Sequence, residues 1–112
     1  MPTHEPLSLP GWIMASARRA LLGQTPAPLR EYSFTFDEGA KRITLKAEVE
    51  RELTETERED LAVAETEMYA DRIFDDATDI ETLVEVVPLG QPLHPLPGGV
   101  AYLREGERAV AA

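Results

Sequence analysis

The sequence predicts one α+β domain in which two helices cover one face of an antiparallel four-stranded sheet. Two stretches of alternating apolar and polar residues are joined by a short turn, which is typical of a β-hairpin. A long helical stretch follows this hairpin, and two shorter β-type stretches follow that helix. With a first helix before the hairpin, the order along the chain is αββαββ. Four strands with one apolar face each match two amphipathic helices.

The first helix is predicted over residues 11–22, after a proline-containing segment at residues 1–10 that we expect to be a flexible arm. Gly23 follows the last apolar residue and is typical of a helix C-terminus. One face of this helix gathers the apolar residues that we expect in the core: Ile13, Met14, Ala17, Ala20 and Leu21.

The hairpin is predicted from residues 30–37 and 43–50, which alternate with a period of two on either side of a turn at residues 37–40. Apolar side chains take the inward positions of both strands, and polar ones take the outward positions. The expected inward residues are Tyr32, Phe34, Phe36, Ile43, Leu45, Ala47 and Val49.

A second helix is predicted between Leu53 and Phe74, where Thr54 and Glu57 have the spacing of a capping box. At about 100° per residue, a broad and mostly apolar arc lies on one side. We expect this arc to face the sheet. Its members are Ala62, Val63, Thr66, Tyr69, Ala70, Ile73 and Phe74.

The opposite side of this helix carries a group of acidic residues beside a narrow apolar strip. We interpret the two together as a partner-binding face, formed by Glu57, Asp60, Leu61, Ala64, Glu67, Met68 and Asp71. Two simpler explanations remain open. The apolar strip can be a widened core contact with the first helix or the C-terminal tail, and the acidic residues can serve solubility alone.

A third strand is predicted over residues 80–89, and its apolar residues on both faces favour a central or doubly covered position. Residues 88–99 hold four prolines and three glycines, which predicts an irregular loop. A last strand is expected at 100–104, followed by a frayed tail at 106–112. No domain boundary interrupts residues 1–112.

Charge is strongly segregated along the chain. The net charge is −10, yet residues 48–85 carry 15 acidic residues against three arginines, a net of −12. Such a field repels nucleic acid and anionic membranes and attracts basic surfaces. The sequence has no cysteine, no apolar run near the roughly 20 residues of a membrane span, and no signal-peptide pattern. We therefore expect a cytoplasmic protein without a membrane partner.

The sequence shows no catalytic or metal-binding signature. His4 lies in the N-terminal arm and His94 between prolines, so neither is placed beside a serine nucleophile. The acidic turn around Asp75, Asp76 and Asp79 lacks the glycine and the final glutamate of a calcium loop. No glycine-rich loop precedes a helix to hold a phosphate. We therefore predict a non-enzymatic protein without a cofactor or a metal.

Three segments together resemble a family of small acidic bacterial proteins: ALLG at residues 20–23, PLREYSFTFD at 28–37 and AETEMYAD at 64–71. The likeness covers about residues 12–90, and the proline-rich loop and alanine-rich tail depart from the pattern. These proteins are similar to immunity proteins associated with bacterial toxins. The resemblance implies an αββαββ fold and a role in neutralising a toxin.

Two function hypotheses follow from the sequence. In the first, the protein presents its acidic helix to a basic protein partner, such as a toxin or nuclease domain. In the second, it is a self-associating structural or accessory domain that pairs through an open sheet edge. A monomer and a homodimer both remain open.

Overall fold

The computed structural model describes residues 9–71 and 77–107 and shows a single compact α+β domain. The element order αββαββ agrees with the prediction. The bounds of the first helix and of both hairpin strands agree within two residues, whereas the second helix ends at Tyr69 and not at Phe74. The elements are α1 (Leu9–Leu21), β1 (Leu29–Asp37), β2 (Arg42–Val49), α2 (Glu55–Tyr69), β3 (Asp79–Val86) and β4 (Gly99–Leu103).

The four strands form one mixed sheet in the order β3-β2-β1-β4. The strand β1 runs antiparallel to both β2 and β4, as the hairpin pattern predicts, but β3 runs parallel to β2. The prediction of a fully antiparallel sheet was therefore wrong. The physical reason is the connection: α2 carries the chain back along the sheet, so that β3 begins at the same end as β2.

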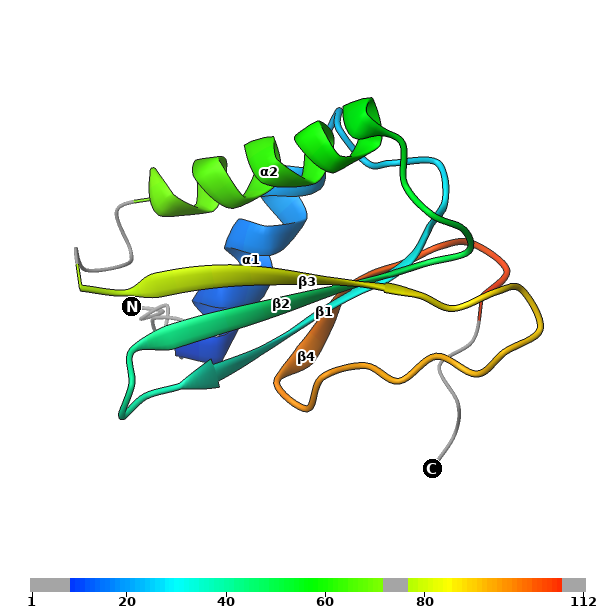
Figure 1. Cartoon of the computed structure of the whole chain (residues 1–112). Helices are drawn as coiled ribbons and strands as arrows, with labels where there is room; N and C mark the ends of the chain where they lie inside the picture. Colours follow the sequence, from blue (N-terminus) through cyan, green and yellow to red (C-terminus); the bar gives the residue numbers. More distant parts are fainter. Residues whose placement is uncertain (1–8, 72–76, 108–112) are drawn as a thin grey trace, which may run out of the picture.

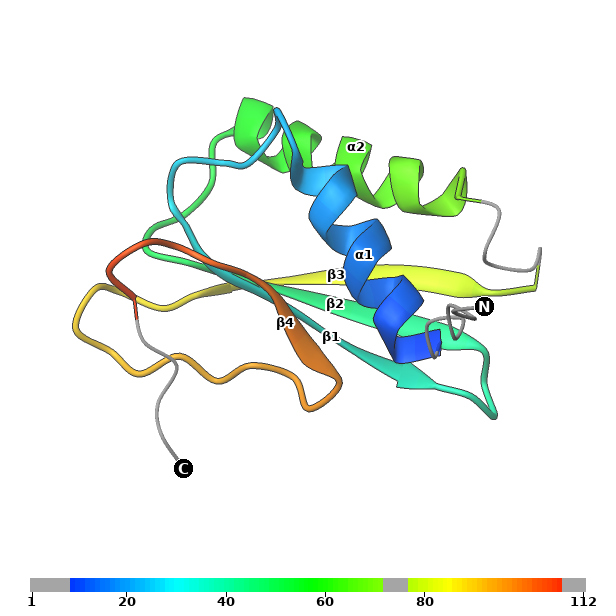
Figure 2. The same cartoon turned by 180° about the vertical axis from the view of Figure 1, so that it is seen from behind.

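Both helices cover one side of the sheet, where α1 lies beside β4 and α2 runs along β3 (Figures 1 and 2). The predicted inward faces of α1 and of the hairpin meet in one core. Gly23 has a φ of 79°, which a glycine adopts without strain, and it follows α1 as expected. The largest fully buried apolar side chains in this core are Tyr32, Phe34, Ile13, Leu29, Ile43, Leu45, Met68 and Val49.

The other face of the sheet is covered by the proline-rich loop, residues 87–98. Figure 1 shows this loop on the side of the sheet opposite α2. The Lys46 ammonium donates to the His94 carbonyl oxygen at 2.7 Å, and the Leu96 N–H donates to the Ser33 hydroxyl at 2.9 Å. Leu93 is 1% exposed and anchors the loop. The domain therefore has three layers: helices, sheet and loop.

The buried face of α2 is the reverse of the prediction. Leu61, Ala64 and Met68 are 3%, 0% and 0% exposed and pack into the core. The members of the expected arc that the structure describes are all exposed: Ala62, Val63, Thr66, Tyr69 and Ala70. Ile73 and Phe74 lie outside the described residues. The buried stripe of the helix is Leu61, Ala64 and Met68, whose spacing of three and four residues places them on one side. Leu53, just before the helix, is buried as well.

The strand β3 is also placed differently from the prediction, which made it central or covered on both faces. It lies at the edge of the sheet, and Leu83, Val84 and Val86 are 45%, 40% and 47% exposed. The apolar residues on both faces of β3 are therefore only partly covered. This exposure leaves an apolar edge beside the acidic helix.

Candidate partner-binding surface

The acidic helix α2 is fixed at its start by the predicted capping box, which the structure confirms. The Thr54 hydroxyl accepts from the Glu57 N–H at 3.2 Å, and the Glu57 carboxylate accepts from the Thr54 N–H at 2.8 Å. Arg51 adds two donors to the same carboxylate, at 2.8 and 2.9 Å. The Arg51 and Thr54 contacts lower the pKa of Glu57 to about 2. Glu57 thus fixes the start of α2, and its negative charge is compensated by Arg51.

Asp71, at the other end of α2, is also paired. Its carboxylate accepts from the guanidinium of Arg19 in α1, and the Asp71 side chain is 15% exposed. This ion pair ties the two helices together where α2 has just ended at Tyr69. Asp71 therefore contributes less free negative charge than the sequence suggests.

Asp60 and Glu67 are the two predicted acidic residues that remain free. Asp60 is half-buried and Glu67 is exposed. Within residues 9–71 and 77–107, neither carboxylate has an ion-pair or hydrogen-bond partner. Their charge is directed at solvent, where a cationic surface could meet it.

The predicted apolar members of the binding face are not at the surface. Leu61, Ala64 and Met68 form the underside of α2 against the sheet and α1. Exposed apolar surface on this helix comes instead from Val63 and Tyr69, which are 44% and 47% exposed. The structure thus separates the seven predicted residues into buried apolar ones, paired acidic ones and two free acidic ones.

A shallow groove joins α2 to the edge strand β3. It has a volume of about 180 Å³ and is lined by Arg58, Leu61, Ala62, Glu65, Thr82 and Val84. The Thr82 hydroxyl donates to the Glu65 carboxylate at 2.7 Å across this groove. The groove therefore links the acidic helix α2 to the edge strand β3. This connection was not predicted, because β3 was expected inside the sheet.

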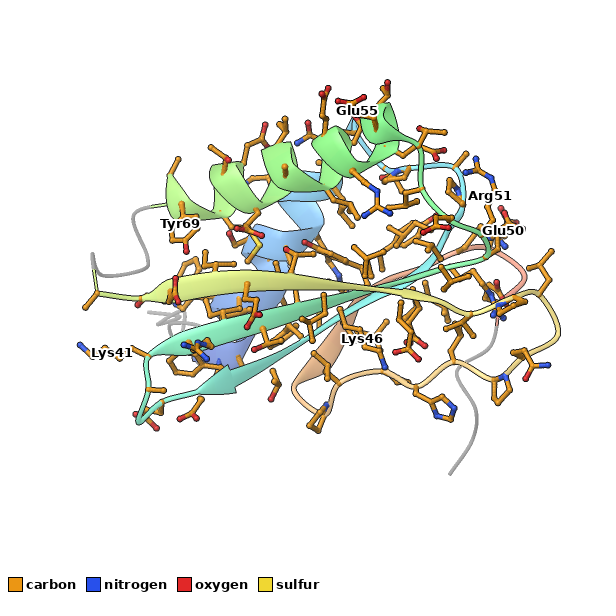
Figure 3. The ribbon with its side chains drawn as sticks, viewed as in Figure 1. Lys41, Lys46, Glu50, Arg51, Glu55 and Tyr69 are labelled. Atoms are coloured by element: carbon orange, nitrogen blue, oxygen red, sulfur yellow. The ribbon has the colours of Figure 1, made fainter. Side chains whose placement is uncertain are left out.

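Tyr69, the last residue of α2, contacts the start of β3. Figure 3 shows its side chain pointing from α2 toward the start of β3. Its hydroxyl accepts from the Ile80 N–H at 2.8 Å and donates to the Asp79 carboxylate at 2.9 Å. Asp79 also lies 3.8 Å from Arg42, so its carboxylate is engaged in holding the strand.

The residues considered for chemistry do not form a reactive site in the described part of the chain. No group of three or more metal-ligating side chains occurs there, and Asp75 and Asp76 lie outside it. The side chain of His94 is exposed in the proline-rich loop. One carboxyl pair, Glu31 and Glu48, is 0% exposed beneath that loop and beyond the reach of a substrate.

Taken together, a packed α+β core and an acidic helix on its surface are typical of a small binding protein. Residues 10–106 match the family described as MafI2 immunity protein, and the chain belongs to this family. Membership confirms the resemblance to toxin-associated immunity proteins and assigns a toxin-neutralising role that is exerted by binding. No curated protein matches the chain. None of the helices in the described ranges is long and apolar enough to cross a membrane.

Proposed function

We propose that this immunity protein neutralises its toxin by presenting the acidic outer side of α2, together with β3, to a basic surface of the toxin. The supporting observation is charge segregation. Residues 48–85 have a net charge of −12, whereas the rest of the chain has a net charge of +2. A predominantly acidic surface on a rigid element attracts a basic surface and orients the encounter.

The toxin surface that suits this charge is a cleft that holds phosphate groups. A nuclease domain must carry lysine and arginine in such a cleft, because its substrate is a polyanion. An acidic protein surface can occupy the same cleft and exclude the substrate. This mechanism needs no catalysis by the immunity protein, which fits the family's role in binding.

Within this surface, Asp60 and Glu67 are the members of the predicted binding face whose carboxylates are unpaired in the described residues. Glu57 and Asp71 support the surface indirectly, because their carboxylates are held by Arg51 and Arg19. Apolar contact is supplied by Val63, not by the buried strip of α2. The binding face therefore keeps the acidic residues predicted from the sequence, but exposed Val63 takes the place of the buried Leu61, Ala64 and Met68.

The test compares two variants with equal charge loss. Asp60→Asn with Glu67→Gln removes two unpaired acids of α2, and Glu38→Gln with Glu105→Gln removes two exposed acids elsewhere. Association with a catalytically inactive form of the cognate toxin is measured at low and high salt. We expect the α2 variant to associate several-fold more slowly at low salt, with the difference shrinking as salt screens the field. Equal rates for the two variants would show that the toxin binds elsewhere.

Self-association is the second candidate function, and the open edge of β3 is the observation that favours it. An unpaired edge strand can pair with the same strand of a second copy. The mass in solution at two salt concentrations decides this point. A dimer formed through backbone pairing persists at high salt, whereas a monomer at both concentrations removes this candidate.

A further inference from the structure

The outer edge of β3 carries a row of unpaired backbone groups. The N–H groups of Asp79 and Val87 donate toward β2, to the carbonyls of Lys41 and Val49 at 2.8 and 2.7 Å. Successive residues of a strand direct their backbone N–H and C=O groups to opposite edges. The backbone groups of the even-numbered residues of β3 therefore point away from β2, toward the open edge of the sheet. The Ile80 N–H confirms this direction, since it bonds to Tyr69 rather than to β2.

Three outward-facing residues are left without a backbone partner on this edge within the described ranges: Thr82, Val84 and Val86. They offer three N–H donors and three carbonyl acceptors in register. Tyr69 blocks the edge at Ile80, and the chain turns away at Pro88. The open stretch is therefore bounded at both ends, and it has the length of a short docked strand.

The opposite edge of the sheet is protected in ways that β3 is not. Strand β4 has five residues, and its pairing with β1 shifts register between Tyr32 and Ser33. The Arg18 side chain of α1 also donates to the Ala101 carbonyl at 3.2 Å. Short length, a bulge and a covering helix are common ways to block strand addition. Strand β3 is eight residues long and keeps a continuous register with β2. Its edge is blocked only at Ile80, by Tyr69, among the described residues.

The two faces of β3 carry different side chains, apolar on the helix side and acidic on the loop side, and this difference favours one kind of added strand. On the helix side, Val84 and Ala62 line the groove, so an added strand would meet an apolar surface there. On the loop side, Glu81 and Glu85 are exposed and acidic, although Glu85 also pairs with Lys46 at 3.1 Å. An added strand therefore fits best when apolar side chains face the groove and cationic ones face these glutamates.

We propose that the open edge of β3, at Thr82, Val84 and Val86, binds an extended segment of the toxin in which apolar residues alternate with lysine or arginine. The segment adds a fifth strand to the sheet through backbone hydrogen bonds. This inference rests on the proposed function for the existence of a basic toxin surface. It goes further by naming the edge, the backbone groups and the residue pattern of the bound segment.

The experiment uses the full chain and the catalytically inactive cognate toxin. Val84→Pro removes one outward N–H without breaking a bond to β2, whereas Val84→Ala keeps that N–H and shortens the side chain. We expect Val84→Pro to weaken binding by roughly tenfold or more, and Val84→Ala by clearly less. A thermal unfolding curve of each variant shows whether the fold is retained.

Amide hydrogen exchange gives a second measurement that needs no substitution. In the complex, we expect slowed exchange at Thr82, Val84 and Val86, with no change at Leu83, whose N–H already faces β2. Fast exchange at all three outward amides in a saturated complex would overturn the proposal. Slowed exchange in the free chain that grows with its concentration would also overturn it, because a second copy would then be the occupant.

These results are distinguishable from a failure of the proposed function. If the Asp60 and Glu67 variant associates normally while the β3 amides become protected, the acidic helix is not the steering surface and the edge site stands. If association slows but the amides stay exposed, the acidic surface stands and the edge site is excluded.

Discussion

Glu31 and Glu48 are the residues whose chemistry departs most from their ordinary state. They face each other across β1 and β2, and both are 0% exposed. Glu48 accepts from the His94 N–H at 2.8 Å, while neither Glu31 carboxyl oxygen has a hydrogen-bond partner among the described residues. Burial and the adjacent Glu48 raise the pKa of Glu31 to about 7, although Lys46 and Arg30 oppose this rise. The folded chain therefore favours the protonated form of Glu31.

This proton makes stability depend on pH. Between pH 4.5, the ordinary value for Glu31, and pH 7, the folded chain holds a proton that the unfolded chain has lost. The free energy of unfolding is therefore highest at the acidic end of this range and falls as pH rises through 7. We expect a loss on the order of 1–3 kcal/mol in urea unfolding between pH 5 and pH 8.

Glu31→Gln supplies the control for this dependence. The amide keeps the shape and cannot titrate, so the pH slope should flatten while the fold is kept. Glu57 does not contribute to this pH dependence between pH 5 and pH 8, because its pKa is about 2 in the folded chain and 4.5 ordinarily. An unchanged slope in Glu31→Gln would mean that another group binds the proton.

At the scale of single elements, the hairpin and the start of α2 could be predicted from the sequence, and the placement of β3 could not. Alternation in β1 and β2 and the Thr54 cap are local signals, because neighbours in the chain determine them. The direction of β3 depends on how α2 crosses the sheet. A helix of 15 residues between two strands is a signal for a parallel pair, and it was available in the sequence.

The exposed side of α2 was only partly predictable for a related reason. Periodicity shows which residues share a side of a helix, but two sides of α2 carry apolar residues. Only packing shows that Leu61 and Met68 enter the core while Val63 stays at the surface. The partner-binding role of the acidic residues stays a prediction, and the ion-pair partners of Glu57 and Asp71 could be found only in the tertiary structure.

The reversed face of α2 gives a direct stability test. Met68 is 0% exposed, so Met68→Ala should leave a cavity and cost about 2–5 kcal/mol of unfolding free energy. Val63 is 44% exposed, and Val63→Ala should change stability by about 0.5 kcal/mol or less. Urea denaturation of the two variants compares both sides of one helix. A larger loss for Val63→Ala would restore the orientation that the apolar arc suggested.

At the scale of the whole molecule, Arg30 connects the sheet, the proline-rich loop and the C-terminal segment. Its guanidinium donates to the carbonyls of Val87, Pro88 and Gln91 at 2.9–3.1 Å, and to the Glu107 carboxylate at 2.9 Å. The Arg30 side chain is 5% exposed. These contacts hold the third layer over the sheet face that carries the buried carboxyl pair.

Removing this cation should loosen the third layer. Arg30→Met keeps the aliphatic stem but leaves three carbonyls and Glu107 without their donor, so we expect a loss of about 3–5 kcal/mol. The matched control is Arg104→Met, because Arg104 also contacts Glu107, at 3.2 Å, but its side chain is 26% exposed. Its loss should stay near 1 kcal/mol. Urea unfolding gives the energies, and limited proteolysis should cleave residues 87–98 faster in Arg30→Met alone. Equal cleavage of both variants would show that the loop is held by its apolar anchor Leu93, because the arginine contacts would then be dispensable.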